Sequence, residues 1–204
     1  MFSLFYIYQS EMETTIQSIL FFIGVLLLFS CAPSQNSIYK SDYPMSLEIV
    51  RSSNTSLSLR IPEGWLSVEE NLKHSIDLWL FSEDYTMSIT VNPIHIDSLT
   101  ALEVKRNGGN DLTAVLNYSK AFRKAFLGFN YKEVEEDEYF TINSIACAAY
   151  QYFDENEFSV RVVLFRYGNF YYEVVAGFEK PDKGVGSKAE SLFKIQNSVL
   201  SSLK

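Results

Sequence analysis

The sequence predicts an α+β fold in which helices pack on an antiparallel sheet. Apolar and polar side chains alternate in several short segments, which is typical of strands with one buried face. The middle of the chain changes to a helical period, and short turns join the strands instead of crossover segments. With 204 residues, 47% of them hydrophobic, the chain is long enough for one folded domain with one core.

The first predicted strands lie in the first half of the chain. Leu57, Leu59 and Ile61 alternate with polar residues, and the same alternation recurs at residues 85–91. Residues 77–81 form a shorter strand, joined to the next through a Ser-Glu-Asp sequence that suits a hairpin loop. Each of these strands is expected to have one face in contact with solvent.

Two helices are predicted next, at residues 98–104 and 111–127, separated by Gly108 and Gly109. The second helix carries an apolar stripe, which predicts that this side covers a face of the sheet. The stripe consists of Leu112, Val115, Leu116, Phe122 and Phe126.

The last part of the chain returns to strands. Residues 131–142, 144–153, 158–166 and 170–178 are rich in Tyr, Phe, Val and Ile. Gly168-Asn169 fits a tight turn with glycine at its first central position, so the last two strands are expected to form an antiparallel hairpin. Residues 187–203 form a final helix with an apolar stripe.

Three short motifs carry a family resemblance. A strand ends in the turn Pro62-Glu63-Gly64-Trp65, residues 167–174 read Tyr-Gly-Asn-Phe-Tyr-Tyr-Glu-Val, and residues 193–200 read Phe-Lys-Ile-Gln-Asn-Ser-Val-Leu. This layout resembles the PsbP-like superfamily, named for an extrinsic subunit of photosystem II. The resemblance implies an α/β/α sandwich around a central antiparallel sheet over residues 45–204, and a non-catalytic binding or assembly role. It implies no catalytic residues.

The first thirty residues are typical of an export signal. Residues 20–29 form an apolar run too short to span a bilayer but suited to the core of a signal peptide. The run ends in Leu28-Phe29-Ser30-Cys31, which resembles a bacterial lipoprotein signal. That resemblance implies cleavage before Cys31, which becomes the new N-terminus and carries on its sulfur a diacylglyceryl lipid with fatty acids such as palmitate. We therefore expect a signal peptide at residues 1–30, a lipidated cysteine and flexible tether at 31–44, and the folded domain at 45–204.

Other interpretations of the leader stay open at this point. It fits an uncleaved transmembrane helix or a simple secretory signal, and translation could begin at Met1 or at Met12. In an organism with two membranes, Ala32 after the cysteine favours the outer membrane. Under the lipoprotein interpretation the protein lies in the cell envelope, held at the membrane by lipid.

Charge and motif content narrow the functional classes. The 17 basic and 25 acidic residues give a net charge of −8, which opposes binding to nucleic acid and to anionic lipid. Cys147 is expected to be a buried free thiol. His74 and His95 are the only imidazoles, and the sequence contains no metal or cofactor motif, so no cofactor is expected. His95 with Asp97 leaves an envelope hydrolase as one alternative.

Aromatic residues on the last strands suggest a second alternative. Tyr150, Tyr167 and Tyr171 are candidates for a surface that binds a saccharide or another small ligand, provided that they are exposed. The other interpretation places such rings beneath a second layer of helices. The favoured function is a non-catalytic, lipid-anchored envelope protein that binds an unknown envelope protein.

Overall fold

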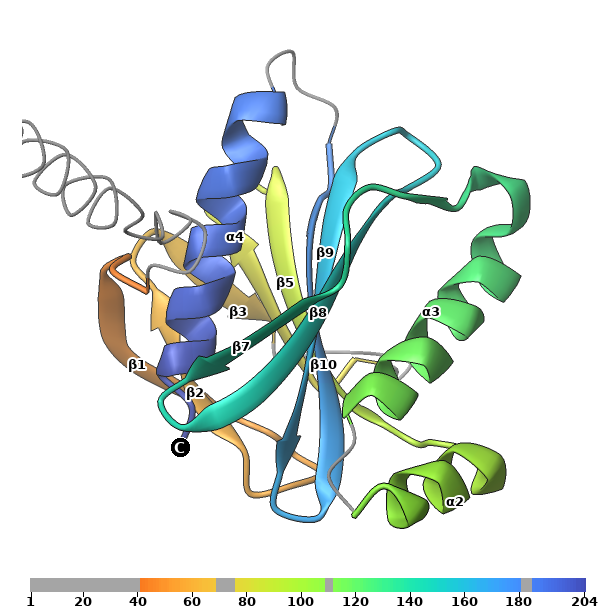
Figure 1. Ribbon diagram of the computed structural model, residues 1–204. Coiled ribbons are helices and arrows are strands. Elements are labelled where there is room, and N and C mark those ends of the chain that lie inside the picture. Colours follow the sequence, from red (N-terminus) through yellow and green to blue (C-terminus); the bar gives the residue numbers. More distant parts are fainter. Residues whose placement is uncertain (1–40, 69–75, 109–111, 181–184) are drawn as a thin grey trace, which may run out of the picture. The chain divides into compact units, whose positions relative to one another are not determined.

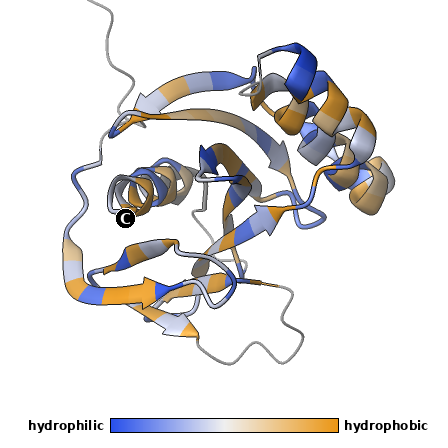
Figure 2. Ribbon diagram, turned by 90° about the horizontal axis from the view of Figure 1, so that it is seen from below, coloured by the Kyte–Doolittle hydropathy of each residue, from blue (hydrophilic) through white to orange (hydrophobic). Residues whose placement is uncertain are grey.

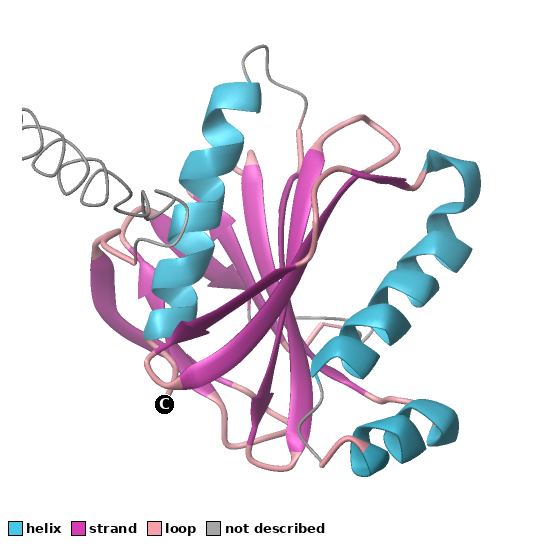
Figure 3. Cartoon of the chain, viewed as in Figure 1, coloured by secondary structure: helices cyan, strands magenta, loops and turns pink. Residues whose placement is uncertain are grey.

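The computed structural model describes residues 41–68, 76–108, 112–180 and 185–204, which belong to one compact unit, Ser37–Lys204. Cys31 and His74 lie outside the described residues. The strands are β1 (Met45–Arg51), β2 (Ser58–Pro62), β3 (Trp65–Val68), β4 (Leu78–Ser82), β5 (Met87–Ile94), β6 (Lys132–Glu133), β7 (Glu138–Ile142), β8 (Ile145–Phe153), β9 (Ser159–Tyr167) and β10 (Phe170–Phe178). The helices are α2 (Ser98–Arg106), α3 (Leu112–Leu127), the short 3-10 helix η2 (Gly128–Asn130) and α4 (Val185–Ser201) (Figures 1 and 3).

The central sheet is antiparallel, which confirms the α+β class. Its strands run in the order β3-β4-β5-β10-β9-β8-β6, and β7 also pairs with β8. β1 and β2 form a separate two-stranded sheet. The β9–β10 hairpin turns at Gly168-Asn169, and Gly168 has a φ of +58°, as expected for a glycine at the first central position.

The segment expected as one strand over residues 131–142 is divided in two. β6 pairs with the end of β8 at Tyr152 and Phe153, whereas β7 pairs with the first five residues of β8. The residues between β6 and β7 include Glu135, Glu136 and Asp137, whose charges favour solvent over a ladder position. β1 and β3 are further strands that the alternation did not indicate.

Helices cover both faces of the sheet, so the expected α/β/α sandwich is confirmed. Figure 2 shows α4 inside the curve of the sheet and the α2–α3 pair outside it. Along β9 the side chains alternate: Val163 and Phe165 join the cluster that includes α4, while Val162 and Leu164 join the cluster that includes α3. Burial on both sides explains why these strands are nearly continuous apolar runs.

The Pro62-Glu63-Gly64-Trp65 motif is the turn between β2 and β3. Gly64 has a φ of +73°, a left-handed conformation that glycine adopts without the steric penalty of a Cβ. Trp65 follows it and is buried in the cluster on the α4 side. The turn therefore directs the chain from the β1–β2 sheet to the edge of the central sheet, as its sequence indicates.

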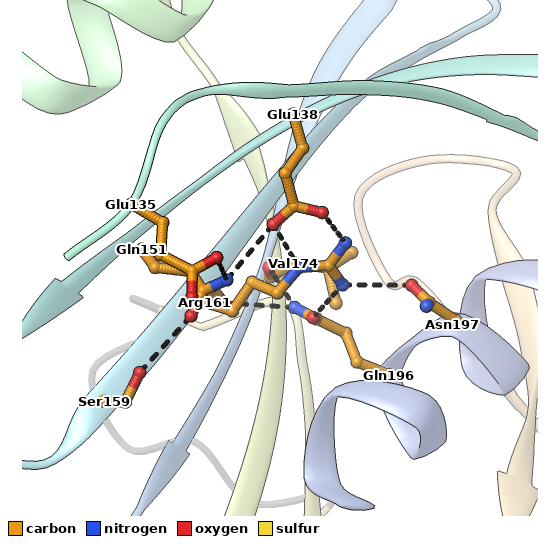
Figure 4. Close-up of polar contacts among 8 residues, drawn as sticks. All are labelled: Glu135, Glu138, Gln151, Ser159, Arg161, Val174, Gln196 and Asn197. Atoms are coloured by element: carbon orange, nitrogen blue, oxygen red, sulfur yellow. Dashed lines mark hydrogen bonds and ion pairs between the residues drawn. The ribbon is translucent and has the colours of Figure 1, made fainter. Parts of the chain in front are cut away.

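A buried polar network joins α4 to the sheet (Figure 4). The side chain of Arg161 on β9 is fully buried, and its guanidinium donates to Glu138 Oε1 at 3.1 Å and Oε2 at 2.8 Å. Its Nη1 donates to Gln196 and Asn197 of α4, each at 3.0 Å. Gln196 in turn donates to the carbonyl oxygens of Arg161 and Val174. These bonds compensate for placing a charge in the core.

The chain already contacts the folded domain at Tyr43, before β1 begins. The backbone N–H of Tyr43 donates to Ser198 Oγ on α4 at 3.1 Å, and its hydroxyl donates to the carbonyl oxygen of Glu63 at 3.0 Å. Tyr43 also packs against the core cluster on the α4 side. Among the helices that the structure describes, none combines the length and apolar character needed to span a bilayer.

Candidate functional site

The outer side of α3 exposes large aromatic side chains. Phe122 is 61% exposed, Phe126 is 78% exposed, and Phe129 in η2 is fully exposed. Their spacing of four and three residues places Phe122 and Phe126 on neighbouring turns and Phe129 just beyond the helix end. We call these three residues the phenylalanine surface. Large apolar side chains gathered in this way mark interaction sites on soluble domains.

The prediction that Phe122 and Phe126 cover the sheet is wrong. The buried side of α3 consists of Leu112, Val115, Leu116 and Ser119 together with Ala114. One turn beyond Ser119, the position that faces the sheet belongs to Arg123, which pairs with Glu173 of β10. Figure 1 shows the C-terminal half of α3 slanting away from the strands. Phe122 and Phe126 belong to this half, and both are exposed.

The helical layer differs in charge from the rest of the chain. Residues 98–127 contain five Lys or Arg and two Asp or Glu, a local excess of three positive charges, whereas the whole chain carries −8. Lys105, Arg106 and Lys124 are exposed. Leu99 and Leu102 of α2 are also exposed apolar residues of this layer. Carboxylates from outside this range pair with Lys120 and Arg123, so the layer combines exposed apolar side chains with three exposed cations.

Polar contacts beneath α3 hold it on the sheet. Arg123 Nη2 donates to Glu173 Oε1 at 2.7 Å, and Ser119 Oγ lies 2.9 Å from the hydroxyl of Tyr150. Ser119 also donates to Glu173 Oε2 at 3.3 Å. Burial opposes the charge of Arg123, but the neighbouring carboxylate of Glu173 leaves its pKa raised. Burial likewise raises the pKa of Tyr150 well above its ordinary value.

The tyrosines considered as a binding surface do not meet the condition of exposure. Tyr150 is fully buried and Tyr171 is 8% exposed, and both belong to the cluster between the sheet and the α2–α3 layer. Tyr167 is partly buried and packs against the cluster on the α4 side. The exposed platform is therefore corrected: the second helix layer covers Tyr150 and Tyr171, and Tyr167 lies on the other face of the sheet.

The candidate hydrolytic pair has other contacts. Asp97 is the N-cap of α2, where its Oδ1 accepts from the backbone N–H of Thr100 at 2.7 Å. That backbone hydrogen bond lowers the pKa of Asp97. The His95 side chain is exposed, and its carbonyl oxygen accepts from the hydroxyl of Tyr118. Within the described ranges, no group of three or more His, Cys, Asp or Glu side chains is placed to hold a metal ion.

Comparison with solved structures identifies the architecture. The solution structure of cyanobacterial PsbP (CyanoP) from Synechocystis sp. PCC 6803 superposes with a TM-score of 0.51 at 13% sequence identity, covering 77% of this chain and 91% of that chain. The fold is PsbP-like. The fold that the three short motifs implied is therefore confirmed, although a search with family profiles found no match and no curated protein matches the sequence.

Two further solved structures resemble the PsbP-like domain less closely. A crystal structure from Bacteroides thetaiotaomicron VPI-5482 has a TM-score of 0.41 at 12% identity, covering 79% of this chain and 48% of that one. The crystal structure of LpqN, involved in cell envelope biogenesis of Mycobacterium tuberculosis, has a TM-score of 0.44 at 10% identity, covering 77% and 88% of the two chains.

Sequence reasoning missed the phenylalanine surface because the helical stripe was assigned wholly to the core. Phe129 follows Gly128, which has a φ of +57° just past the end of α3. A hydrophobic residue after such a helix terminator often packs on the last turn of the helix, so its position holds no local signal that Phe129 is exposed.

Proposed function

We propose that this chain is a lipid-anchored protein of the cell envelope that binds a partner protein through the phenylalanine surface and performs no catalysis itself. The observation that carries the proposal is the exposure of Phe122, Phe126 and Phe129 on one side of a well-packed helix. Aromatic residues of this kind supply most of the binding free energy when they enter pockets on a partner.

Charge favours a partner protein over a lipid surface. The net charge of −8 repels an anionic membrane, so the chain as a whole gains little from approaching one. The exposed cations of the helical layer, Lys105, Arg106 and Lys124, instead suit a compact acidic surface. The partner class is therefore a protein with an apolar patch bordered by Asp and Glu.

The proposed anchor is compatible with access to this surface. Eleven residues lie between Cys31 and Tyr43, and a chain of that length reaches at most about 40 Å. Tyr43 contacts α4, which lies on the opposite face of the sheet from α3. A tether that joins the domain at α4 leaves the phenylalanine surface free to meet a partner.

The absence of catalysis is supported by the contacts of the candidate residues. Asp97 holds the first turn of α2, so its carboxylate is engaged by the backbone in place of an imidazole. A general base is normally oriented by a group that contacts it directly. The motifs that resemble the PsbP-like superfamily also imply binding or assembly without a reaction.

The test is site-specific photocrosslinking in living cells. We replace Phe126 with p-benzoylphenylalanine, irradiate, and identify the crosslinked protein by mass spectrometry. The matched control carries the same residue at Tyr85, an exposed aromatic position in the turn between β4 and β5. We expect position 126 to crosslink to one protein, and we expect position 85 not to crosslink to that protein.

The second step uses purified components. The captured protein should bind the full-length chain directly, and Phe122→Ser should weaken that binding by about tenfold or more, as for an interface anchor. Failure of the purified proteins to bind, or equal capture from both positions, contradicts the proposal. Flotation with liposomes that depends on Phe126 in a Cys31→Ser chain would instead assign the surface to the membrane.

A further inference from the structure

A cavity of about 410 Å³ lies where three parts of the chain meet at one end of the sheet. These parts are the β1–β2 connection, the neighbouring ends of β4 and β5, and the β9–β10 hairpin. Its lining includes Asn54, Asp77, Asn92, Pro93, His95 and Phe170. No residue of the phenylalanine surface lines this cavity, but Pro93 and His95 also line a smaller neighbouring cavity together with Phe122.

Three polar side chains in the lining form a fixed row. Asn54 Nδ2 donates to Asp77 Oδ1 at 3.0 Å, and the backbone N–H of Asp77 donates to Asn92 Oδ1 at 3.0 Å. Because Asn92 accepts through its oxygen, its Nδ2 remains a donor for another group. The row joins a loop to two strands, so its polar atoms are positioned before any ligand arrives.

One buried oxygen of this row, Oδ2 of Asp77, has no hydrogen-bond partner among the described residues. Burial raises the pKa of the nearby Tyr172, a side-chain hydrogen bond with Thr55 opposes part of that rise, and the charge of Asp77 adds to it. Unsatisfied buried polar atoms are rare in folded proteins and costly.

We infer that this cavity binds a saccharide or another cyclic polyol. A sugar hydroxyl both donates and accepts, which matches a lining that offers a carboxylate, two amides and an imidazole. Asp77 lines the cavity and its Oδ2 has no donor in the described part of the chain, so a ligand hydroxyl can donate to this oxygen while Oδ1 keeps its bond from Asn54. Phe170, at the rim and 46% exposed, offers an aromatic face to the C–H groups of a sugar ring.

Other ligand classes fit the lining less well. An anion in the cavity is repelled by the carboxylate of Asp77, and the lining residues include no Lys or Arg side chain to offset that repulsion. A divalent metal favours several charged or imidazole ligands around one point, and no group of three or more His, Cys, Asp or Glu side chains occurs in the described part of the chain. A neutral ligand with several hydroxyl groups uses both the polar row and the aromatic rim.

The test is isothermal titration calorimetry on the full chain in a detergent without a sugar headgroup. The probes are glucose and N-acetylglucosamine, with choline and inorganic phosphate as ligands of other charge. We expect at least one of the two sugars to bind. We expect Phe170→Ala and Asp77→Asn each to weaken that binding by about tenfold. Tyr85→Ala is the matched control, an exposed aromatic residue outside the cavity, and should change the affinity less than twofold.

Several results would overturn the inference. These are no heat from either sugar, sugar binding that both variants retain, or binding of choline or phosphate lost in the same two variants. Thermal melts show whether both variants fold. If Asp77→Asn does not fold, the test rests on Phe170→Ala alone. Because Phe126→Ser should leave sugar affinity unchanged, failure here is distinguishable from failure of the proposed protein interface.

Discussion

Arg161 and Glu138 form a two-point ion pair inside the protein, with Nε and Nη2 of the arginine 3.1 and 2.8 Å from the two carboxylate oxygens. The arginine has no exposed side-chain surface, and 11% of the glutamate side chain is exposed. Removing one partner of such a pair leaves an uncompensated buried charge. The pair also links β9 to the short edge strand β7, so its loss affects how that edge is held.

Glu138→Gln should therefore destabilise the protein by about 3–5 kcal/mol. Urea unfolding followed by circular dichroism gives the free energy of unfolding. The matched control is Glu157→Gln, which breaks an exposed pair with Lys132 and should change that free energy by less than about 0.5 kcal/mol. Equal effects of the two substitutions would mean that the buried pair contributes no more to the free energy of unfolding than the exposed pair does.

Two substitutions on α3 distinguish its buried and exposed sides. Leu116 is fully buried, so Leu116→Ala should lower the free energy of unfolding by about 2–5 kcal/mol. Phe126→Ser, ten residues further along the same helix, should change it by less than about 0.5 kcal/mol because the ring is exposed. A large loss of stability in Phe126→Ser would contradict the exposed position and show that the ring contributes to the core.

Asp97 should act as a helix cap whose effect depends on pH. Its pKa is lowered in the folded protein by the backbone hydrogen bond from Thr100, so the cap is fully present above the ordinary pKa of 3.8. The contribution is lost as pH falls through the lowered value. Asp97→Ala should lower the melting temperature at neutral pH, whereas Asp97→Asn, which can still cap, should largely preserve it. Indistinguishable melting curves for the two variants would argue against the cap.

Cys147 should be unreactive while the protein is folded. Burial raises the pKa of its thiol to about 11 from 9.0, so little thiolate is present near neutral pH. Mass spectrometry should find the Cys147 peptide unmodified by iodoacetamide in buffer and alkylated in urea. Because the folded state holds this proton more tightly, its contribution to stability is complete below pH 9 and declines toward pH 11. Cys147→Ala should show a smaller decline over that interval.

The proposed anchor predicts the mass of the mature protein. Purified from its native membrane, the chain should lack residues 1–30 and carry fatty acyl groups on Cys31. Cys31→Ser should abolish acylation and reduce membrane retention. A chain that keeps its leader, or one with an unmodified Cys31, would contradict the lipid anchor.

The positions of the strands and helices could be predicted because the signals for them lie in residues that are neighbours in the sequence. Richness in Tyr, Phe, Val and Ile indicates β9 and β10, and Gly168-Asn169 indicates their turn. The sides of α3 could not be assigned in this way. The residue that pairs with Arg123 is Glu173, fifty positions away in the sequence, and only the folded chain brings the two together.

The sequence pattern likewise did not indicate that the charged side chain of Arg161 is buried. Arg161 stands within an apolar strand, where alternation alone does not distinguish a solvent position from a core position that receives partners from α4 and β7. The cavity at Asp77 has the same origin, since its lining comes from separate segments of the chain. Cys31 and its leader lie outside the described residues, so the anchor stays a prediction.

If the proposed anchor holds copies of this chain side by side on a membrane, the limits of the central sheet have a consequence for them. One outer strand, β3, has four residues, and the far side of β8 is shared between a strand of two residues and one of five. Each outer strand therefore offers only a short row of free N–H and C=O groups to a neighbouring copy. Crowding in the plane of a bilayer would give these edges little opportunity to join into an aggregate.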